Sequence, residues 1–401
     1  MRKMYLFTGG DQTAHNGLIA RLDAEFPGVA SLVLRRETVD ALLSGPHRAS
    51  DGNDHRRAST ASRALGAEFF EAATRTRMGH GETVFLDPGP VGVTEIIETT
   101  KITRHFAYTL FVVDFAGDLD PASLSTPYPA DISVITPEQV RHTLIEPILD
   151  LGAQARVVVL GDVQSCARSL NAILEATDAR TADLVVFAGD LYDRGPDPAS
   201  VYRTVRELED QVPVIRVRGN HDKILTTLRF RPDTVNSRAA RQPRETIRAC
   251  AAEGIKIGDL ADQDATTVSY LAFTAGGTEY HVTHGGAAYL GPRTPGGYAS
   301  GIVAEDTLIY GENTPESTQD DRHSRAFDID RHLHADHQLS GIVHVRGHSS
   351  VKGRSPDHFP GVYALESEVE FGSHLTALVI DGTHRSVVQV PGEEQVKGWN
   401  H

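Results

Sequence analysis

The sequence predicts an α/β protein built from two domains. Its 401 residues exceed what a single hydrophobic core usually holds. Short apolar runs alternate with segments of helical periodicity along most of the chain, which is typical of parallel sheets covered by helices. The polar residues that follow these runs differ between the two halves. We therefore expect one domain over residues 1–150 and a second over residues 153–395.

The first half begins with a short strand, a glycine turn and a helix. Residues 5–7 are apolar, and a helical pattern starts at about residue 14. Residues 84–86 and 110–113 are continuous apolar runs, so we expect buried parallel strands over residues 82–86 and 108–113. Residues 116–133 are rich in Pro, Ser, Asp and Gly and predict a loop, and we expect a helix over residues 137–151 to close this half.

The second half contains three apolar strands that each end in a polar cluster. Residues 156–160 lead to Asp162, residues 184–188 lead to Asp190, and residues 213–217 lead to Asn220. Successive strand ends lie about 30 residues apart, the length of one βαβ unit. The three clusters should therefore lie side by side at the carboxyl edge of a parallel sheet, where open α/β sheets bind ligands.

The composition limits the compartment and the partners. The hydrophobic fraction of 40% and charged fraction of 23% are those of an ordinary globular protein, and two cysteines exclude a disulfide framework. We find no run of eighteen apolar residues and no apolar N-terminal stretch, so we expect a cytoplasmic protein without a membrane segment. The net charge of −15 favours a small phosphorylated substrate or a nucleic-acid end over long nucleic acid.

Carboxylates, an amide and imidazoles at the strand ends form a candidate metal site. The set comprises Asp162, Asp190, Asn220, His284 and His348. This mixture of oxygen and nitrogen donors suits Mn, Fe, Zn, Co or Ni better than Mg or Ca. A carboxylate that bridges two such ions holds them about 3.5–4 Å apart, and a water between them becomes a hydroxide that can attack phosphorus.

The motifs resemble those of the calcineurin-like phosphoesterases. Residues 161–164 stand where that family has Gly-Asp-x-His, and residues 189–195 match Gly-Asp-x-x-Asp-Arg-Gly. Residues 219–222, 284–286 and 347–348 complete the set in the family's order. The resemblance implies a four-layer α/β/β/α domain with two metal sites.

The same resemblance implies a role for each motif residue. Asp190 would bridge the metals, Asp162 would bind the first, and Asn220, His284 and His348 would hold the second. His221 would be the general acid, oriented by Asp222 or Asp193, and Arg194 would bind the phosphate. Gln164 replaces a first-site histidine with a weaker, harder amide oxygen, so occupancy of the first site is open.

Residues 1–150 resemble, more weakly, the P-loop kinase domain of bacterial polynucleotide kinase-phosphatases, without their ligase module. Segments 39–45, 77–84 and 87–91 follow the order of that family. The candidate nucleotide-binding residues are Gly9, Gly10, His15, Asn16, Glu37 and Asp87. Because His15 and Asn16 replace the phosphate-binding lysine and the Mg²⁺-binding hydroxyl, we expect a degenerate kinase fold without ATP-dependent activity. A scaffold or homo-oligomer surface is the alternative.

We therefore expect a metal-dependent hydrolase of a phosphate monoester or cyclic phosphodiester. A nucleotide or nucleic-acid end is the preferred substrate, on resemblance alone. Glu366 stands where related phosphatases have the Asp of Asp-Thr-Gly, which indicates a remodelled substrate pocket. The alternatives are a protein phosphatase, a dinucleoside-polyphosphate hydrolase, or a pseudoenzyme that binds a nucleotide or a partner.

Overall fold

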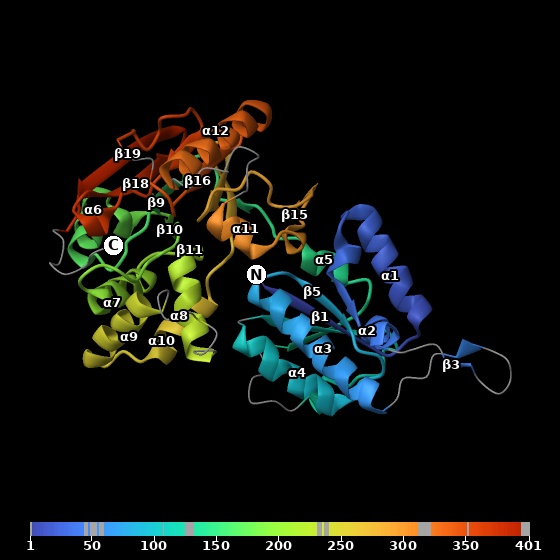
Figure 1. The fold of residues 1–401 in the computed structure, drawn as a ribbon. Helices are drawn as coiled ribbons and strands as arrows, with labels where there is room; N and C mark the ends of the chain where they lie inside the picture. Colours follow the sequence, from blue (N-terminus) through green and yellow to red (C-terminus); the bar gives the residue numbers. More distant parts are fainter. Residues whose placement is uncertain are drawn as a thin grey trace. The chain divides into compact units, whose positions relative to one another are not determined.

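The computed structural model describes residues 2–43, 47–48, 54–55, 60–106, 108–124, 132–230, 235, 240–311, 322–350 and 353–393. The chain forms two compact units (Figure 1). The first comprises Met1–Glu146 and Gly291–Glu305, and the second comprises Pro147–Leu290 and Asp306–His401. The chain thus leaves the first unit slightly earlier than the expected boundary near 151, and a later segment, Gly291–Glu305, returns to it.

The first unit is built on a parallel sheet in the order β2-β5-β1-β6-β7. Alternate residues of β1 face opposite sides of it, so that Tyr5 and Phe7 pack with α1 and α5, while Met4 and Leu6 pack with α3 and α4. The strands are β1 (Lys3–Thr8), β2 (Val33–Arg35), β5 (Val84–Asp87), β6 (Thr109–Asp114) and β7 (Ile132–Ile135). The helices are α1 (Gln12–Glu25), α2 (Arg36–Leu43), α3 (Thr60–Gly79), α4 (Val93–His105) and α5 (Val140–Leu144). Two small hairpins join β3 (His47–Arg48) to β4 (Asp54–His55) and β14 (Arg293–Thr294) to β15 (Gly297–Tyr298).

Two expectations for this half were wrong. The helix expected over residues 137–151 is the single short α5, because Glu146 bridges to Tyr298 and β8 (Leu149–Asp150) pairs with β12 of the second unit. The expected loop over 116–133 reaches into a strand, since β7 pairs with β6 from Ile132 onward. Residues 125–131 of that segment lie outside the described residues.

The second unit packs two five-stranded sheets face to face. Their orders are β11-β10-β9-β18-β19 and β17-β16-β13-β12-β8. Residues such as Val157 and Val159 of β9 face Phe273 and Val282 of the other sheet, and together they form the core between the sheets. The strands are β9 (Arg156–Leu160), β10 (Leu184–Phe187), β11 (Val214–Arg216), β12 (Leu271–Ala275), β13 (Thr278–Thr283), β16 (Val343–Arg346), β17 (Val362–Ala364), β18 (His374–Asp381) and β19 (His384–Pro391).

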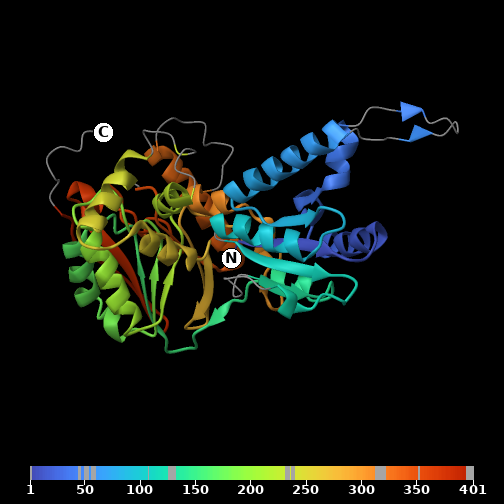
Figure 2. The ribbon, with the colours of Figure 1, turned by 90° about the horizontal axis from the view of Figure 1, so that it is seen from below.

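Helices cover the outer faces of both sheets and give four layers. Leu170 of α6 and Val205 of α7 join Val158 and Leu160 in the core outside the first sheet, and Figure 2 shows these helices in green beside the strands. Helix α12 covers β16 and β17 of the second sheet. The helices are α6 (Ala167–Ala176), α7 (Pro198–Glu209), α8 (Asn220–Phe230), α9 (Arg241–Ala252), α10 (Ile257–Ala265), α11 (Glu305–Tyr310) and α12 (Arg322–Ser340). No helix among the described residues is long and apolar enough to span a membrane.

This architecture explains why distant motifs meet. β9, β10 and β11 run parallel, so the segments that follow them leave the same edge of the first sheet. β13 and β16 also run parallel in the second sheet and are followed by His284 and His348. The two sheets therefore deliver five separate turns to one place.

The core between the sheets sets the stability of this unit. Phe273 is fully buried there and stacks on Tyr280 with ring centroids 4.9 Å apart. We expect Phe273→Ala to lower the free energy of unfolding of the second unit by about 3–5 kcal/mol, because it removes apolar contacts and leaves a cavity. Urea unfolding followed by circular dichroism measures this, with Leu339→Ala, at a side chain 90% exposed, as the control within about 0.5 kcal/mol of wild type. Equal effects of both variants would contradict the assignment of this core.

Candidate metal centre and active site

Three potential ligands converge at the edge of the two sheets. One oxygen each of Asp162 and Asp190 and a ring nitrogen of His284 all lie within 4.8 Å of one another. The three residues are buried. Carboxylate oxygens and imidazole nitrogen are ligands of divalent transition metals, so this cluster fits such a cation.

Asn220 and His348 extend the cluster. The Asn220 Oδ1 lies 2.9 Å from the His348 Nδ1 and 3.1 Å from the His284 Nε2. His284 donates its Nδ1–H to the carbonyl of Ala188 at 2.8 Å, which leaves its Nε2 facing the Asp190 Oδ2 at 3.4 Å. A histidine held through one ring nitrogen offers the other as a ligand with a fixed orientation. The structure thus brings together five of the six residues predicted as metal ligands, and the sixth, Gln164, contacts Asp190.

The second sheet anchors His348 through a buried arginine. Arg346 is fully buried and pairs with Asp330 of α12, with N–O distances of 2.5 and 2.6 Å. Its Nη1 donates to the carbonyls of Gly347 and Ser349 on both sides of His348. The turn that carries His348 is therefore fixed by a charge pair beneath it.

Several site residues adopt left-handed backbone conformations. The φ angles are 47° at Gln164, 49° at Asp190, 89° at Asp193, 55° at Arg194 and 66° at His348. Such conformations cost of order 1–3 kcal/mol each outside glycine and cluster at functional sites. They turn the side chains out of the direction that each strand would otherwise impose.

The close approach of two motifs explains why residue 219 is a glycine. A Cβ placed on Gly219 would lie 2.0 Å from the Asp190 Oδ1, so no larger residue fits beside this carboxylate. The absence of a side chain lets the backbone amide of His221 donate to the same Oδ1 at 2.9 Å. The Gly-Asn-His-Asp motif thereby packs directly on the second aspartate.

The two aspartates differ in their electrostatic environment. Burial and the nearby charge of Glu366 raise the pKa of Asp162 well above its usual value. Burial alone would also raise the pKa of Asp190, but the charges of His284 and His221 outweigh it and hold that pKa below its usual range. Burial and the neighbouring His284 lower the pKa of His348 to about 3, so this imidazole is neutral and able to bind a metal.

Gln164 lies inside the cluster. It is 1% exposed, and its Nε2 donates to the Asp190 Oδ2 at 3.1 Å. Its Oε1 is buried and has no hydrogen-bond partner among the described residues. A buried acceptor without a donor is costly, and a cation beside it would remove that cost.

His221 is held by Asp193 and not by Asp222. Its Nδ1–H donates to the Asp193 Oδ2 at 2.6 Å, and Thr246 of α9 donates to the other oxygen of Asp193 at 2.9 Å. The His221 Nε2 accepts from Arg194 at 2.8 Å. Burial lowers the pKa of His221, but the charge of Asp190 and the hydrogen bond to Asp193 outweigh burial, and the pKa is raised. Of the two expected orienting carboxylates, the geometry selects Asp193.

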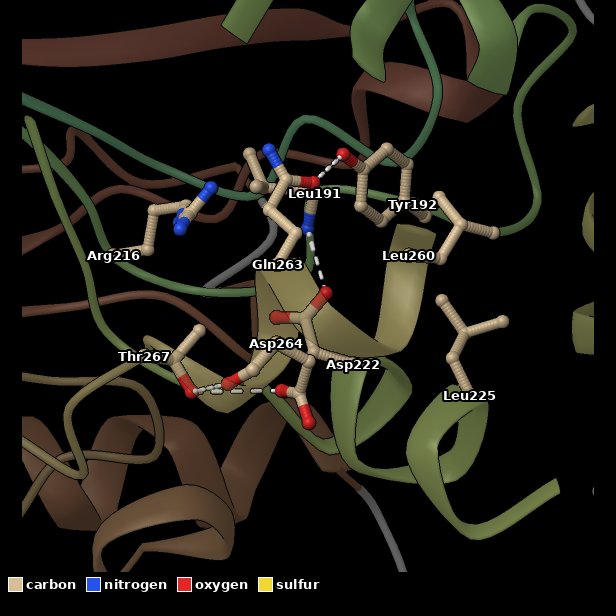
Figure 3. A pocket seen from close by; sticks show the side chains of 9 residues that line it. All are labelled: Leu191, Tyr192, Arg216, Asp222, Leu225, Leu260, Gln263, Asp264 and Thr267. Atoms are coloured by element: carbon tan, nitrogen blue, oxygen red, sulfur yellow. Dashed lines mark hydrogen bonds between the residues drawn. The ribbon is translucent and has the colours of Figure 1, made fainter. Parts of the chain in front are cut away.

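Asp222 has a different task. It accepts hydrogen bonds from the backbone amides of Gly219, Asp190 and Leu191, so it ties the second and third motifs together. Figure 3 shows it at a small pocket between α8 and α10, where Tyr192 donates to the side chain of Gln263. Among the described residues, the Asp222 side chain makes no hydrogen bond to the His221 ring, so the alternative that Asp222 orients His221 is not supported.

The candidate nucleotide-binding residues of the first unit make hydrogen bonds and close contacts within the protein. His15 bonds the carbonyl of Gly9 through Nε2 at 2.8 Å and lies 3.2 Å from Asp87 through Nδ1. The Asp11 carboxylate accepts from the amide of Ala14 and so caps the N-terminus of α1, where a phosphate would otherwise bind. These contacts occupy hydrogen-bonding groups through which a phosphate would bind at this turn.

The remaining candidates are dispersed around that turn. A Cβ on Gly10 would lie 2.7 Å from the Cβ of Phe115, so the turn packs closely on the segment after β6. Asn16 accepts from Arg35 at 2.7 Å, and Glu37 is exposed in the first turn of α2. The structure therefore places Gly9, Gly10, His15 and Asp87 together but does not show a nucleotide site.

Two residues at the site were missed by sequence analysis. Glu370 accepts from Arg194 at 3.0 Å, and Thr246 supports Asp193. Neither belongs to a motif with fixed spacing. The only signal for Glu370 was an acidic residue between two apolar ones, Val369 and Phe371.

The family comparison agrees with this geometry. The model of the calcineurin-like phosphoesterases matches residues 155–362, more than half of the chain. The chain belongs to this family of metal-dependent phosphoesterases, which confirms the resemblance inferred from the motifs. The match does not extend to residues 1–150, so their kinase-like character stays a prediction.

Similar proteins of known name match shorter segments. The symmetrical bis(5'-nucleosyl)-tetraphosphatase of Nitrosospira multiformis is 42% identical over 67 residues, 16% of this chain and 24% of that protein. The enzyme of the same name from Coxiella burnetii is 37% identical over 82 residues, 20% of this chain and 27% of that protein. The chain thus spans about a quarter of the length of these relatives.

Solved structures give more distant likenesses. The cold-active protein-tyrosine phosphatase of a Shewanella species is 16% identical with a TM-score of 0.38, over 62% of this chain and 83% of that one. A metallophosphoesterase from Sphaerobacter thermophilus is 15% identical with a TM-score of 0.35, over 60% of this chain and 89% of that one.

The contacts of His221 predict a leaving-group effect. We expect His221→Asn to lower kcat on an alkyl phosphate by about 10²–10⁴-fold, because a poor leaving group needs a proton. The loss on p-nitrophenyl phosphate, whose leaving group departs without protonation, should be far smaller. Asp193→Asn should show the same selectivity for the alkyl ester, whereas Asp222→Asn should lower both activities alike. Equal losses on the two esters in His221→Asn would contradict the general-acid assignment.

Proposed function

We propose that the second unit hydrolyses a phosphate monoester or a cyclic phosphodiester of a nucleotide or nucleic-acid end, with two divalent cations. The observation that carries the proposal is the junction of two groups of side chains. The potential ligands Asp162, Asp190, Asn220, His284 and His348 adjoin a His221–Asp193 pair and Arg194. These are the parts that ligation, protonation and phosphate binding require.

Each residue has a task in such a reaction. Bound divalent cations would supply Lewis acidity and lower the pKa of an attacking water. Arg194, 28% exposed at its side chain, offers a planar fork to two phosphate oxygens. In this proposal Arg194 leaves the His221 Nε2 when it binds the phosphate, so that the protonated imidazole can give the proton on Nε2 to the departing alkoxide oxygen. Asp193 keeps the ring oriented through Nδ1 and stabilises its charged form.

The substrate class rests on two supports. The net charge of −15 disfavours a long polyanion and leaves small phosphorylated molecules or ends. A dinucleoside polyphosphate is the second candidate, favoured by the names of the relatives that match 64–82 residues of this chain. Both candidates place a nucleotide next to the scissile phosphate.

A substrate panel tests the proposal. We expect phosphate release with Mn²⁺ from a nucleotide monophosphate, a 2',3'-cyclic nucleotide or a dinucleoside tetraphosphate, but not from a phosphopeptide. Asp190→Asn should abolish release, because this residue lies at the centre of the ligand cluster. Chromatography of the products identifies the cleaved bond. No release from any substrate with any divalent metal would instead favour a binding protein without turnover.

The first unit should lack kinase activity. The Asp11 cap and the His15–Gly9 bond occupy the positions where a phosphate-binding loop offers free amides and a lysine. We expect no transfer of labelled phosphate from ATP to an oligonucleotide with a 5'-hydroxyl, with a known polynucleotide kinase as the positive control. Transfer that His15→Ala abolishes would overturn this prediction.

A further inference from the structure

Two glutamates lie next to the first of the aspartates. Glu366 and Glu370 belong to the segment between β17 and β18, which packs on the end of β9. A Cβ on Gly161 would lie only 2.4 Å from the carbonyl oxygen of Leu365, so this segment adjoins the turn that carries Asp162. Glu366 and Glu370 are 6% and 7% exposed.

Each glutamate has one oxygen anchored and one oxygen without a partner. The Glu366 Oε1 accepts from the amide of Glu368 at 3.0 Å, and the Glu370 Oε1 accepts from Arg194 at 3.0 Å. The Oε2 atoms of both are buried and lack a hydrogen-bond partner among the described residues. Buried carboxylate oxygens are expensive to leave unpaired, which calls for a cation or donor beside them.

Gln164 repeats this arrangement from the other side. Its Nε2 is anchored on Asp190, and its Oε1 is buried without a hydrogen-bond partner in the part of the chain that the structure describes. Near Asp162 and Asp190, three buried side-chain oxygens from two separate segments therefore lack a hydrogen-bond partner among the described residues. Gln164 also stands at the position where the motif would otherwise supply an imidazole.

The charge of the region points the same way. Four buried carboxylates, Asp162, Asp190, Glu366 and Glu370, lie in this region, where Arg194 pairs with Glu370 and the charges of His221 and His284 act on Asp190. Such a cluster is stable in its ionised form only when further positive charge is bound.

We propose that Glu366 and Glu370 complete an all-oxygen first cation site with Asp162, Asp190 and Gln164. Because the group of ligand atoms within 4.8 Å of one another contains Asp162 and Asp190 but neither glutamate, Glu366 and Glu370 reach the ion through its water molecules. A hard divalent cation, Mn²⁺ or Mg²⁺, fits this donor set better than Zn²⁺, because carboxylate, amide and water oxygens suit hard ions. The second site, with the imidazoles of His284 and His348, accepts softer ions. Gln164 in place of a histidine and the presence of Glu370 thus act together to shift the metal preference of the first site toward hard ions.

This inference rests on the proposed two-cation chemistry, but binding tests it without turnover. Mn²⁺ binding to the full chain is followed by electron paramagnetic resonance and calorimetry, with Zn²⁺ and Mg²⁺ as competitors. We expect two Mn²⁺ per chain. Glu366→Gln and Glu370→Gln should each weaken one site by about 10–100-fold and leave the other unchanged. Asn220→Ala should weaken only the other site.

Two further variants keep the test independent of folding. Glu368→Gln changes a half-buried carboxylate on the same segment and should bind Mn²⁺ like the wild type. Gln164→His restores an imidazole and should shift the first site toward Zn²⁺ by about tenfold.

Two binding results would overturn the inference: a wild type that binds a single Mn²⁺, or glutamate variants that bind two Mn²⁺ with wild-type affinity. Two bound cations without phosphate release from any substrate would contradict the proposed function alone.

Discussion

Asp162 and Asp190 end two neighbouring parallel strands, and both carboxylates are 2% exposed. Like charges this close to one another and this far from water repel strongly, so much of the surrounding structure serves to offset them. His284 and Asn220 approach from two other strand ends, amides of His221 and His348 donate to the carboxylates, and Gln164 donates from the side. The pair can persist because five turns converge on it.

That convergence requires unusual backbone and buried charge elsewhere. Left-handed conformations at Asp190 and His348 aim the ligands, and a glycine at 219 allows one motif to touch the next. Asp222 binds three backbone amides across these turns, and the Arg346–Asp330 pair holds the turn of His348 from beneath. Strain near the candidate ligands is therefore opposed by hydrogen bonds from neighbouring buried residues.

The chain shares the phosphoesterase motifs but distributes its donors differently on the two sides of Asp190. One side presents the imidazoles of His284 and His348 with the amide of Asn220. The other side carries Asp162, Gln164 and the two glutamates of the segment that packs on Gly161. Arg194 links the halves of the site, since it contacts both Glu370 and His221. Because Arg194 donates to Glu370, a phosphate that bound Arg194 would compete with this carboxylate.

The sequence by itself determined the α/β class, the strands that carry the motifs and the candidate ligands that the second unit brings together. These follow from local patterns: apolar runs end at fixed polar residues, and parallel strands bring such ends to one edge. Tertiary structure alone decided which carboxylate orients His221, since Asp222 is its neighbour in the chain but the distant Asp193 makes the contact. It also decided the contacts of Glu370 and Thr246, the return of Gly291–Glu305 to the first unit and the short α5. Each of these depends on residues far apart in the chain, whose proximity has no periodicity or spacing to reveal it.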